Sequence, residues 1–212
     1  MKNRGLRIAV TMRESNAQGY AEERDSLARS WITFLDTVLP EAAWLALPNI
    51  GERRVDRFCE QWGINGLILT GGEDISVSAA RDETERTLLH LALERDWPVF
   101  GVCRGLQLIW HEFGGDLGPV EGHIARRHKV RIDGSRIGNE FEANSYHGKG
   151  PLLSSGLMAE PNRVFAYAMD GTIEGVKFRG GQVLGIMWHP EREPKPAPID
   201  AFLVRKLFLL EQ

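Results

Sequence analysis

The stretch PVFGVCRGLQ, residues 98–107, runs an apolar segment into a cysteine that stands between two glycines. The apolar residues 98–102 are typical of a short buried strand, and RGLQLIWHEF at 104–113 is typical of a helix. A chain that turns sharply from strand to helix at a reactive residue needs strained backbone angles, and Gly101 and Gly105 keep such a turn free of clashes. The stretch therefore predicts a strand, a tight turn at Cys103 and a helix.

On both sides of this stretch, apolar runs of strand length alternate with segments of helical period. That alternation is typical of an α/β fold, in which a mostly parallel sheet carries helices on both faces. The stretch 115–150 is expected to be irregular apart from one strand. We expect strands at 6–12, 44–48, 65–74, 98–102 and 128–133, two or three more within 164–191, and helices at 22–38, 55–62, 81–96, 104–113 and 199–210.

The chain has 212 residues, of which 42% are hydrophobic and 26% charged, and its net charge is −3. This length suits one domain, expected to span residues 1–212. The small negative charge offers no electrostatic footprint for nucleic acid, and no apolar run approaches the roughly 18 residues of a membrane span. The apolar run near the N-terminus is too short for a signal peptide. We therefore expect a cytoplasmic protein that binds neither nucleic acid nor membrane.

The two cysteines are expected to be free thiols in a reducing compartment. Cys59 lies on an apolar stripe between Phe58 and Trp62, which is typical of a small core residue. The helix expected to begin at Arg104 directs its free N–H groups at Cys103, which favours the thiolate. A buried structural cysteine could occupy the same kind of turn, so the assignment of Cys103 as a nucleophile depends on partners.

The segment IMWHPE, residues 186–191, supplies candidate partners. In an extended segment His189 and Glu191 project to the same side, so they could complete a Cys/His/Glu triad. The carboxylate would hold the imidazole in the tautomer that accepts the thiol proton. The alternative is a strand-end histidine beside a surface glutamate.

The turn TGGED, residues 70–74, supplies candidate donors for an oxyanion. Gly71 and Gly72 allow a reacting oxygen to approach the backbone closely, and the N–H of Arg104 would complement them. TGGEDI has neither of the glycine spacings of a phosphate-binding loop.

TGGED, GVCRGLQ and MWHPE, in this order along the chain, resemble the class I glutamine amidotransferase family. The resemblance covers nearly the whole chain and implies a flavodoxin-like sheet, a Cys/His/Glu triad and no cofactor. The residues it implies are Cys103 as nucleophile, His189 as base and acid, Glu191 as the orienting carboxylate, Gly72 and Arg104 as oxyanion donors, and Gln107 as a contact for the glutamyl head group.

Three further segments, RDETE (81–85), EANSYH (142–147) and DGTIEGVKF (170–178), are similar to the γ-glutamyl hydrolase branch of this family. That branch cleaves γ-glutamyl amides without a synthetase partner, so no obligatory partner is expected. For His147 the alternative is an ordinary loop histidine. The residues that the branch resemblance implies for binding the α-amino and α-carboxylate groups of the substrate are Asn144, Ser145 and His147.

Other residues bear on the identity of the leaving group. NSYHGKG lacks the second histidine and the following glutamine often found in members that hydrolyse γ-glutamyl-γ-aminobutyrate, and Trp110 stands where an asparagine is common. Shorter members release cytidine diphosphoramidate from its γ-glutamyl adduct in capsule polysaccharide modification. This chain is similar to them around EERDSLARSWITFL, NSYH and HPERE.

The loop after the first expected strand could hold an anionic leaving group. Ligands of parallel sheets bind beyond the carboxyl ends of the strands, so Arg13, Tyr20 and Arg24 are expected near TGGED and CRG. Arg13 and Arg24 could hold a diphosphate, although arginines near a helix start are usually solvated. The substrate prediction is therefore γ-glutamyl-CDP-amidate, with γ-glutamyl-γ-aminobutyrate or another γ-glutamyl amine as the alternative.

Two functions other than the hydrolysis of a γ-glutamyl amide are alternatives. A glutaminase subunit would pass ammonia to a synthetase, and the hydrolase-like segments RDETE and DGTIE argue against it. A non-catalytic redox-sensing or binding protein could use the same sheet, but it would leave the HPE segment without a purpose.

The remaining histidines carry no site prediction. His90 and His111 lie in expected helices, while His123 and His128 lie near Glu121 in the irregular stretch. No recognised ligand spacing occurs there and the mechanism needs no metal, so no metal site is predicted.

Overall fold

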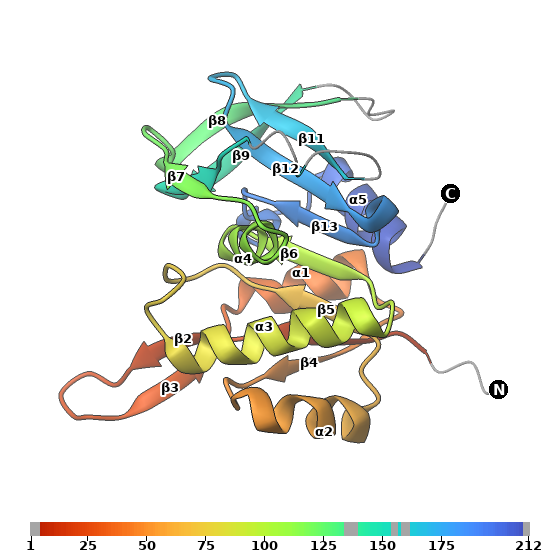
Figure 1. Ribbon diagram of the computed structural model, residues 1–212. Coiled ribbons are helices and arrows are strands. Elements are labelled where there is room, and N and C mark those ends of the chain that lie inside the picture. The colour runs from red at the N-terminus through yellow and green to blue at the C-terminus, as the bar shows by residue number, and fades with distance from the viewer. Residues whose placement is uncertain (1–4, 134–139, 154–156, 158–161, 210–212) are drawn as a thin grey trace.

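The computed structural model describes residues 5–133, 140–153, 157 and 162–209. Within these residues the main feature is a nine-stranded sheet with helices packed on both faces (Figure 1). In spatial order its strands are β4 (Ala43–Leu47), β1 (Arg7–Thr11), β5 (Gly66–Leu69), β6 (Val99–Val102), β13 (Val183–Ile186), β12 (Ile173–Phe178), β11 (Arg163–Ala168), β8 (Ile124–Ile132) and β9 (Glu140–Tyr146). The helices are α1 (Ser30–Val38), α2 (Glu52–Trp62), α3 (Ala79–Glu94), α4 (Arg104–Glu112) and α5 (Pro198–Leu209).

Two kinds of pairing divide this sheet. From β4 through β1, β5 and β6 to β13 every pair is parallel. From β13 through β12, β11 and β8 to β9 every pair is antiparallel. The α/β fold predicted from the sequence is confirmed, and β13 is the strand at which the two pairing patterns meet.

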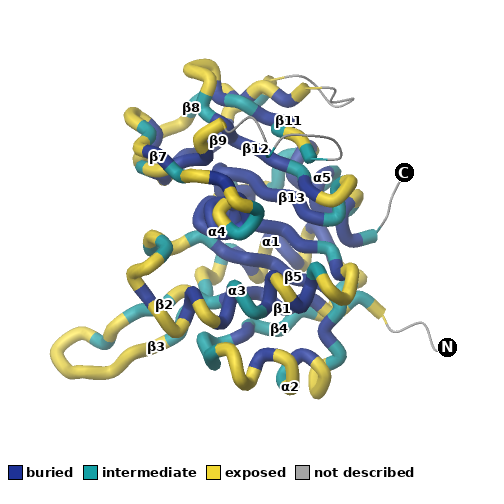
Figure 2. Tube along the Cα trace, viewed as in Figure 1, coloured by how far each residue is buried: buried dark blue, intermediate teal, exposed yellow. Residues whose placement is uncertain are grey.

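Hydrophobic side chains cover both faces of the parallel part. Alternate residues of a strand point to opposite faces, so Ile8 and Val10 join the core under α1 and α5, whereas Ala9 joins the core under α2, α3 and α4. Figure 2 shows the central strands as buried and the outer turns as exposed. Cys59 on α2 is 1% exposed, which confirms its predicted place in the core.

The helix expected at 22–38 begins only at Ser30. Before it, β2 (Arg13–Asn16) and β3 (Glu23–Ser26) pair as an antiparallel hairpin that projects from the molecule (Figure 1). The helix buries Trp31, Phe34, Leu35 and Val38, but residues 22–26 are EERDS and offer no apolar residue to extend that stripe. The prediction was therefore wrong for the first part of this segment.

The stretch 115–150, expected to be irregular, contains four strands among its described residues. The long strands β8 and β9 pair with each other, and β7 (Leu117–Pro119) pairs with β10 (Lys149–Pro151). The only strand expected there, 128–133, matches the end of β8, and residues 134–139 lie outside the described residues. Most side chains of β8 are exposed, so the strand is held by its backbone hydrogen bonds to neighbouring strands. Its sequence therefore lacks the apolar run by which a buried strand is predicted.

Four connections leave the sheet at the carboxyl ends of neighbouring parallel strands. They follow β1, β5, β6 and β13, and they carry Arg13, Thr70–Gly72, Cys103 and His189. Residues after adjacent parallel strands meet at one edge of the sheet, which is where α/β folds bind ligands. None of the helices in the described ranges combines the length and hydropathy needed to cross a membrane.

Candidate active site

Cys103 stands at the turn between β6 and α4. Its backbone has φ 52° and ψ −105°, a conformation that few residues other than glycine adopt. The N–H of Cys103 donates a 2.7 Å hydrogen bond to the carbonyl of Ile186 on β13, which holds the turn in place. The strained strand-to-helix turn predicted from the sequence is thus present, with the thiol at the N-terminus of α4.

The glycines on either side of Cys103 allow close backbone packing. A Cβ added at Gly101 would lie 2.7 Å from the carbonyl carbon of Gly105, and one added at Gly105 would lie 2.8 Å from the carbonyl carbon of Leu69. Both distances are shorter than van der Waals contact. The glycines therefore let the first turn of α4 pack directly against β5 and β6.

His189 and Glu191 form a buried pair beside Cys103. The Nδ1 atom of His189 lies 2.8 Å from Oε1 of Glu191, and both residues are at most 5% exposed. The segment is not extended as expected, because Pro190–Arg192 forms a 3-10 turn directly after His189. With Nδ1 bound by the carboxylate, the Nε2 atom is the nitrogen left for the thiol.

The charge on His189 depends on these two neighbours. Burial alone would lower the pKa of His189, but hydrogen bonds with Cys103 and Glu191 overcome that effect and raise the pKa to about 9. A raised pKa means that the folded protein favours the imidazolium form near neutral pH. The site therefore favours an imidazolium between a carboxylate and the sulfur of Cys103.

The loop after β5 has no room for side chains at its two glycines. A Cβ at Gly71 would lie 2.5 Å from the Cε1 atom of His189, and one at Gly72 would collide with the guanidinium of Arg81. The φ of Gly72 is 154°, which also favours glycine. Nη2 of Arg81 donates to the carbonyls of Thr70 and Gly71 at 2.9 and 3.2 Å, so this buried arginine holds the loop that carries the expected oxyanion donor Gly72.

A network of buried charges lies behind this loop. Nε of Arg81 donates to Glu85 at 2.9 Å, and Arg104 donates to both Glu85 and Asp82. The Arg104 side chain is therefore turned into the interior, leaving only its backbone N–H for the predicted oxyanion role. Sequence reasoning missed the roles of Arg81, Asp82 and Glu85. Their signal is their position on the same helix face as the buried residues Leu88, Leu89 and Ala92.

Asn144 on β9 contacts the backbone of the catalytic candidate rather than the cavity. Its Nδ2 donates to the carbonyl of His189 at 2.8 Å, and its Oδ1 accepts from the N–H of His189 at 2.9 Å. A second bond from Nδ2 reaches Oε1 of Glu193 at 2.7 Å. The observed contacts position His189, and the substrate-binding role expected for Asn144 stays a prediction.

The other residues expected to bind the glutamyl group are also buried away from the cavity. Gln107 donates through Nε2 to the carbonyl of Lys149 at 2.9 Å. Ser145 is fully buried and its Oγ has no hydrogen-bond partner among the described residues. His147 lies 3.2 Å from Glu174, outside the catalytic pair. Their substrate contacts remain predictions.

A cavity of about 420 Å³ opens over Cys103 and His189. Among the predicted site residues, Gly72 and Arg13 also line it, as expected for loops at the carboxyl ends of β5 and β1. The lining residues that sequence reasoning did not identify are Glu14, Ser15, Glu73, Tyr146 and Arg192.

Two arginine side chains line this cavity, but Arg24 is not one of them. Arg24 on β3 is half exposed, donates to Glu22 and Tyr20, and is absent from the described lining. Instead Arg192 lies over the ring of Tyr146, with its guanidinium carbon 4.4 Å from the ring centroid. The structure thus places Arg13 and Arg192, rather than Arg13 and Arg24, in the lining of the cavity that contains Cys103.

Comparisons with known proteins find a family profile, related sequences and a related structure. The Peptidase C26 family profile matches residues 8–191. γ-Glutamyl-CDP-amidate hydrolase from Campylobacter jejuni is 32% identical over 192 residues, covering 88% of this chain and 90% of the relative. γ-Glutamyl-γ-aminobutyrate hydrolase from Escherichia coli (strain K12) is 30% identical over 229 aligned positions, covering 87% and 85%. A glutamine amidotransferase from Thermotoga maritima superposes with a TM-score of 0.64 at 14% identity, over 89% of this chain and 77% of its own, and so shares the fold.

Proposed function

The chain belongs to the Peptidase C26 family, and from this premise we propose that it hydrolyses a γ-glutamyl amide through a thioester on Cys103. The observation that carries the proposal is one cavity lined by both Cys103 and His189, with Glu191 bound to the far nitrogen of the imidazole. This is the arrangement of a nucleophile, a base and an orienting carboxylate. The named activities of the two relatives support the same reaction class.

The first half of the reaction forms the thioester. The sulfur of Cys103 attacks the δ-carbonyl carbon of the substrate, and the carbonyl electrons move to the oxygen. Backbone N–H groups of Gly72 and Arg104 stabilise that oxyanion, at about 3 to 4 kcal/mol of transition-state energy per donor. His189 gives a proton from Nε2 to the departing nitrogen, the C–N bond breaks and the amine or phosphoramidate leaves.

The second half releases glutamate. His189, now neutral, accepts a proton from a water molecule that attacks the thioester carbon, and the C–S bond breaks to return the Cys103 thiolate. Glu191 stabilises the imidazolium in both halves because it stays bound to Nδ1. Every proton in this cycle passes through one imidazole, and no partner protein is required.

The charges of the cavity support an anionic leaving group. Arg13 and Arg192 line it beside the nucleophile, and arginine forks are well suited to phosphate oxygens. Glu14 and Glu73 also line the cavity and could receive the α-amino group of the glutamyl part. Together with the named activity of the Campylobacter jejuni relative, this supports γ-glutamyl-CDP-amidate as the substrate, with cytidine diphosphoramidate as the second product.

The test measures glutamate release from three candidate substrates: γ-glutamyl-CDP-amidate, γ-glutamyl-γ-aminobutyrate and glutamine. The wild-type protein is expected to hydrolyse the nucleotide adduct fastest, and Cys103→Ala is expected to release no glutamate above background. Cys59→Ala is the matched control, because it removes the other cysteine outside the site. Equal rates for Cys103→Ala and wild type would refute the proposed reaction.

The same assay separates the substrate from the reaction class. A preference for γ-glutamyl-γ-aminobutyrate that still requires Cys103 would keep the thioester chemistry and refute the diphosphate assignment. Activity on glutamine alone would indicate a glutaminase subunit.

For the substrate proposed, Arg192→Ala should raise KM for the nucleotide adduct at least tenfold and leave KM for γ-glutamyl-γ-aminobutyrate nearly unchanged, since a hydrogen bond to a charged group contributes about 1.5–3 kcal/mol.

A further inference from the structure

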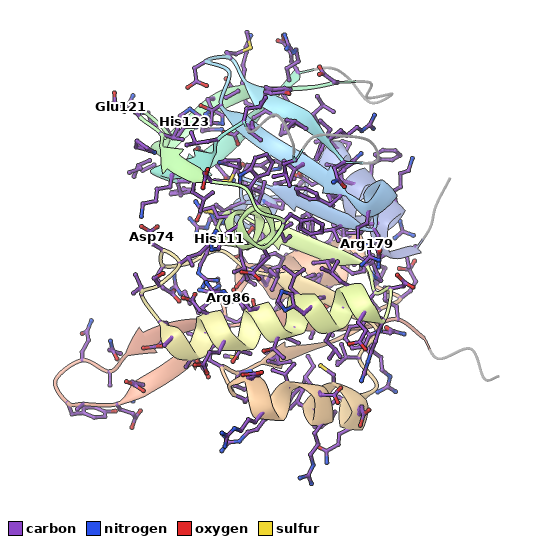
Figure 3. The ribbon with its side chains drawn as sticks, viewed as in Figure 1. Asp74, Arg86, His111, Glu121, His123 and Arg179 are labelled. Atoms are coloured by element: carbon purple, nitrogen blue, oxygen red, sulfur yellow. The ribbon has the colours of Figure 1, made fainter. Side chains whose placement is uncertain are left out.

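Histidine and glutamate side chains from three segments converge outside the catalytic cavity. His123 precedes β8, His128 lies within it, His147 follows β9 and Glu174 belongs to β12. Figure 3 shows His123 near Glu121 at the β7 and β8 end of the molecule, apart from His111 on α4. His123, His147 and Glu174 are each at most 4% exposed. The sequence showed no ligand spacing here because the residues come together only through the pairing of the antiparallel strands.

Three atoms of this cluster form a nearly equilateral triangle. Nδ1 of His123 and Nε2 of His147 each lie 3.2 Å from Oε1 of Glu174. The two nitrogens lie 3.3 Å from each other. In a tetrahedral zinc site with bonds of about 2.0 Å, neighbouring ligand atoms are about 3.3 Å apart. The triangle therefore has the size of one face of such a tetrahedron.

The hydrogen bonds on the outer side of each ring determine which atoms face inward. Nε2 of His123 donates to Oδ2 of Asp170 at 2.8 Å, and Nδ1 of His147 donates to the carbonyl of Lys149 at 3.2 Å. A neutral imidazole has a single N–H, and in both rings it is used outward. When both rings are neutral, the inward nitrogens present lone pairs to each other and to a carboxylate oxygen, an arrangement that a cation at its centre would stabilise.

Two further buried atoms at this place lack partners within the described part of the chain. Oε2 of Glu174, in a side chain that is 0% exposed, has no hydrogen bond. Nε2 of His128 also has none, although it lies 3.4 Å from Oε1 of Glu174. Buried polar atoms are rarely left unsatisfied, and those that are need an explanation. A bound ion would supply one.

We propose that His123, His147 and Glu174 bind a Zn²⁺ ion, with His128 as the nearest further ligand. Imidazole nitrogens and a carboxylate oxygen are a common ligand set for zinc. Asp170 and the Lys149 carbonyl would be the outer groups that orient the two ligating rings, as acceptors of this kind do in zinc proteins.

The location indicates a structural role for this ion. The Lys149 carbonyl that orients His147 also accepts from Gln107 on α4, and the carbonyl of Glu174 accepts from Met187, two residues before His189. The ion would thus join β8, the end of β9 and β12. Hydrogen bonds link this point to α4, which directly follows Cys103, and to the segment after β13, which carries His189. None of its proposed ligands lines the cavity.

The test measures zinc content directly, in a Cys103→Ala background that removes the active-site thiol as a competing ligand. The purified full-length chain is stripped with a chelator, mixed with ZnSO4, desalted and analysed by inductively coupled plasma mass spectrometry. We expect about one Zn²⁺ per chain for this parent, far less for added His123→Ala or His147→Ala, and no change for added His111→Ala. Added Zn²⁺ should raise the Tm of the parent but not that of the His123→Ala form.

The alternative to a zinc site is a metal-free cluster of protonated histidines. If the histidines are protonated and simply paired with Glu174, the folded parent retains no zinc and its Tm does not respond, which would overturn the proposal. Equal zinc content in the parent and in both histidine variants would also overturn it. Should His147→Ala fail to fold, Co²⁺ added to the stripped parent gives an independent readout, since a tetrahedral site produces visible absorption that His123→Ala should abolish. None of these measurements depends on the hydrolase activity.

Discussion

Cys59 and Cys103 show how the surroundings of a residue set its chemistry. Burial raises the pKa of Cys59 to about 11, so it remains a thiol on α2. Cys103 stands at a strained turn beside His189 and lines the cavity. Sequence neighbours predicted both environments, because apolar residues flank one cysteine and glycines the other. They could not predict that Tyr146 and Arg192 line the cavity, since that depends on the register of β9 and on a 3-10 turn.

We predict that the two thiols differ in reactivity. In the folded protein near neutral pH, iodoacetamide should modify Cys103 quickly and Cys59 at least tenfold more slowly, because the thiolate is the nucleophile and Cys59 is a buried thiol. Mass spectrometry of peptides after timed quenching measures both sites in one sample. Labelling of Cys59 at the rate of Cys103 would contradict the assignment, and equal rates in denaturant provide the control.

His189 should make stability depend on pH. Its pKa is about 9 in the folded protein and about 6.5 for an unperturbed histidine. A raised folded pKa stabilises the protein fully below about pH 6.5, and that contribution is lost as the pH rises through about 9. The free energy of unfolding, measured by urea titration from pH 6 to 9.5, should therefore fall less steeply with pH in His189→Gln than in wild type. Parallel slopes would show that His189 is not held as an imidazolium.

Asn144 offers a test between positioning and substrate binding. Because its amide bonds the backbone on both sides of His189, Asn144→Ala should lower kcat about tenfold or more with little change in KM, as small displacements of a catalytic group do. Steady-state kinetics separates the two parameters. A large rise in KM at unchanged kcat would instead support the substrate-binding role implied by the family resemblance. Asn162→Ala serves as the control, because the Asn162 side chain bonds to Leu157 and Arg179 and not to His189.

At the scale of elements, the rule that apolar residues are buried and charged residues are exposed does not predict every helix face and strand. The first turns of α3 place Arg81 and Glu85 on its buried face, where they pair with each other and with groups on the loop after β5 and on α4. At the antiparallel edge of the sheet, β8 and β9 carry many charged residues and still form long strands. Apolar patterns predicted the parallel strands well because their side chains are buried on both faces. They failed where backbone pairing or ion pairing holds an element.

The buried network around α3 yields a prediction of stability. Arg81→Met removes the ion-pair partner of Glu73 and leaves the buried Glu85 paired with Arg104 alone, and should lower the free energy of unfolding by about 3 kcal/mol. It also frees the carbonyls of Thr70 and Gly71, so activity should fall as well. Urea denaturation and glutamate release measure the two effects. Arg86→Met, in a partly exposed pair with Glu112, is the matched control and should change stability by only about 1 kcal/mol.

At the scale of the whole molecule, the order of strands brings distant segments together. β13, near the end of the chain, lies between β6 and β12, and this places His189 beside Cys103. Periodicity along the sequence predicts elements but not such an order. The triad was therefore predicted from two separate local patterns, the glycine-flanked Cys103 and the HPE segment, and the family resemblance supported joining them. The position of the site at the carboxyl ends of the strands followed from the α/β pattern itself.

Local stability should vary widely across this architecture. The strands β5, β6 and β13 are buried along their full length, whereas the β2 and β3 hairpin is largely exposed and projects from the body (Figure 2). Amide hydrogen exchange followed by mass spectrometry should show the slowest exchange in those three strands and the fastest in the hairpin, because exposed pairs open with little cost. Protection of the hairpin equal to that of β6 would show that it is held by contacts outside this chain.

Arg104 offers the proposed reaction only a backbone N–H, a group that every residue except proline carries. Its guanidinium is committed to Asp82 and Glu85 in the interior. A saturation library at position 104, selected for activity, would consequently rank amino acids by their fit to the buried network. The same library at Cys103 would rank them by nucleophilicity. Two adjacent positions of one active centre would thus be selected under different rules.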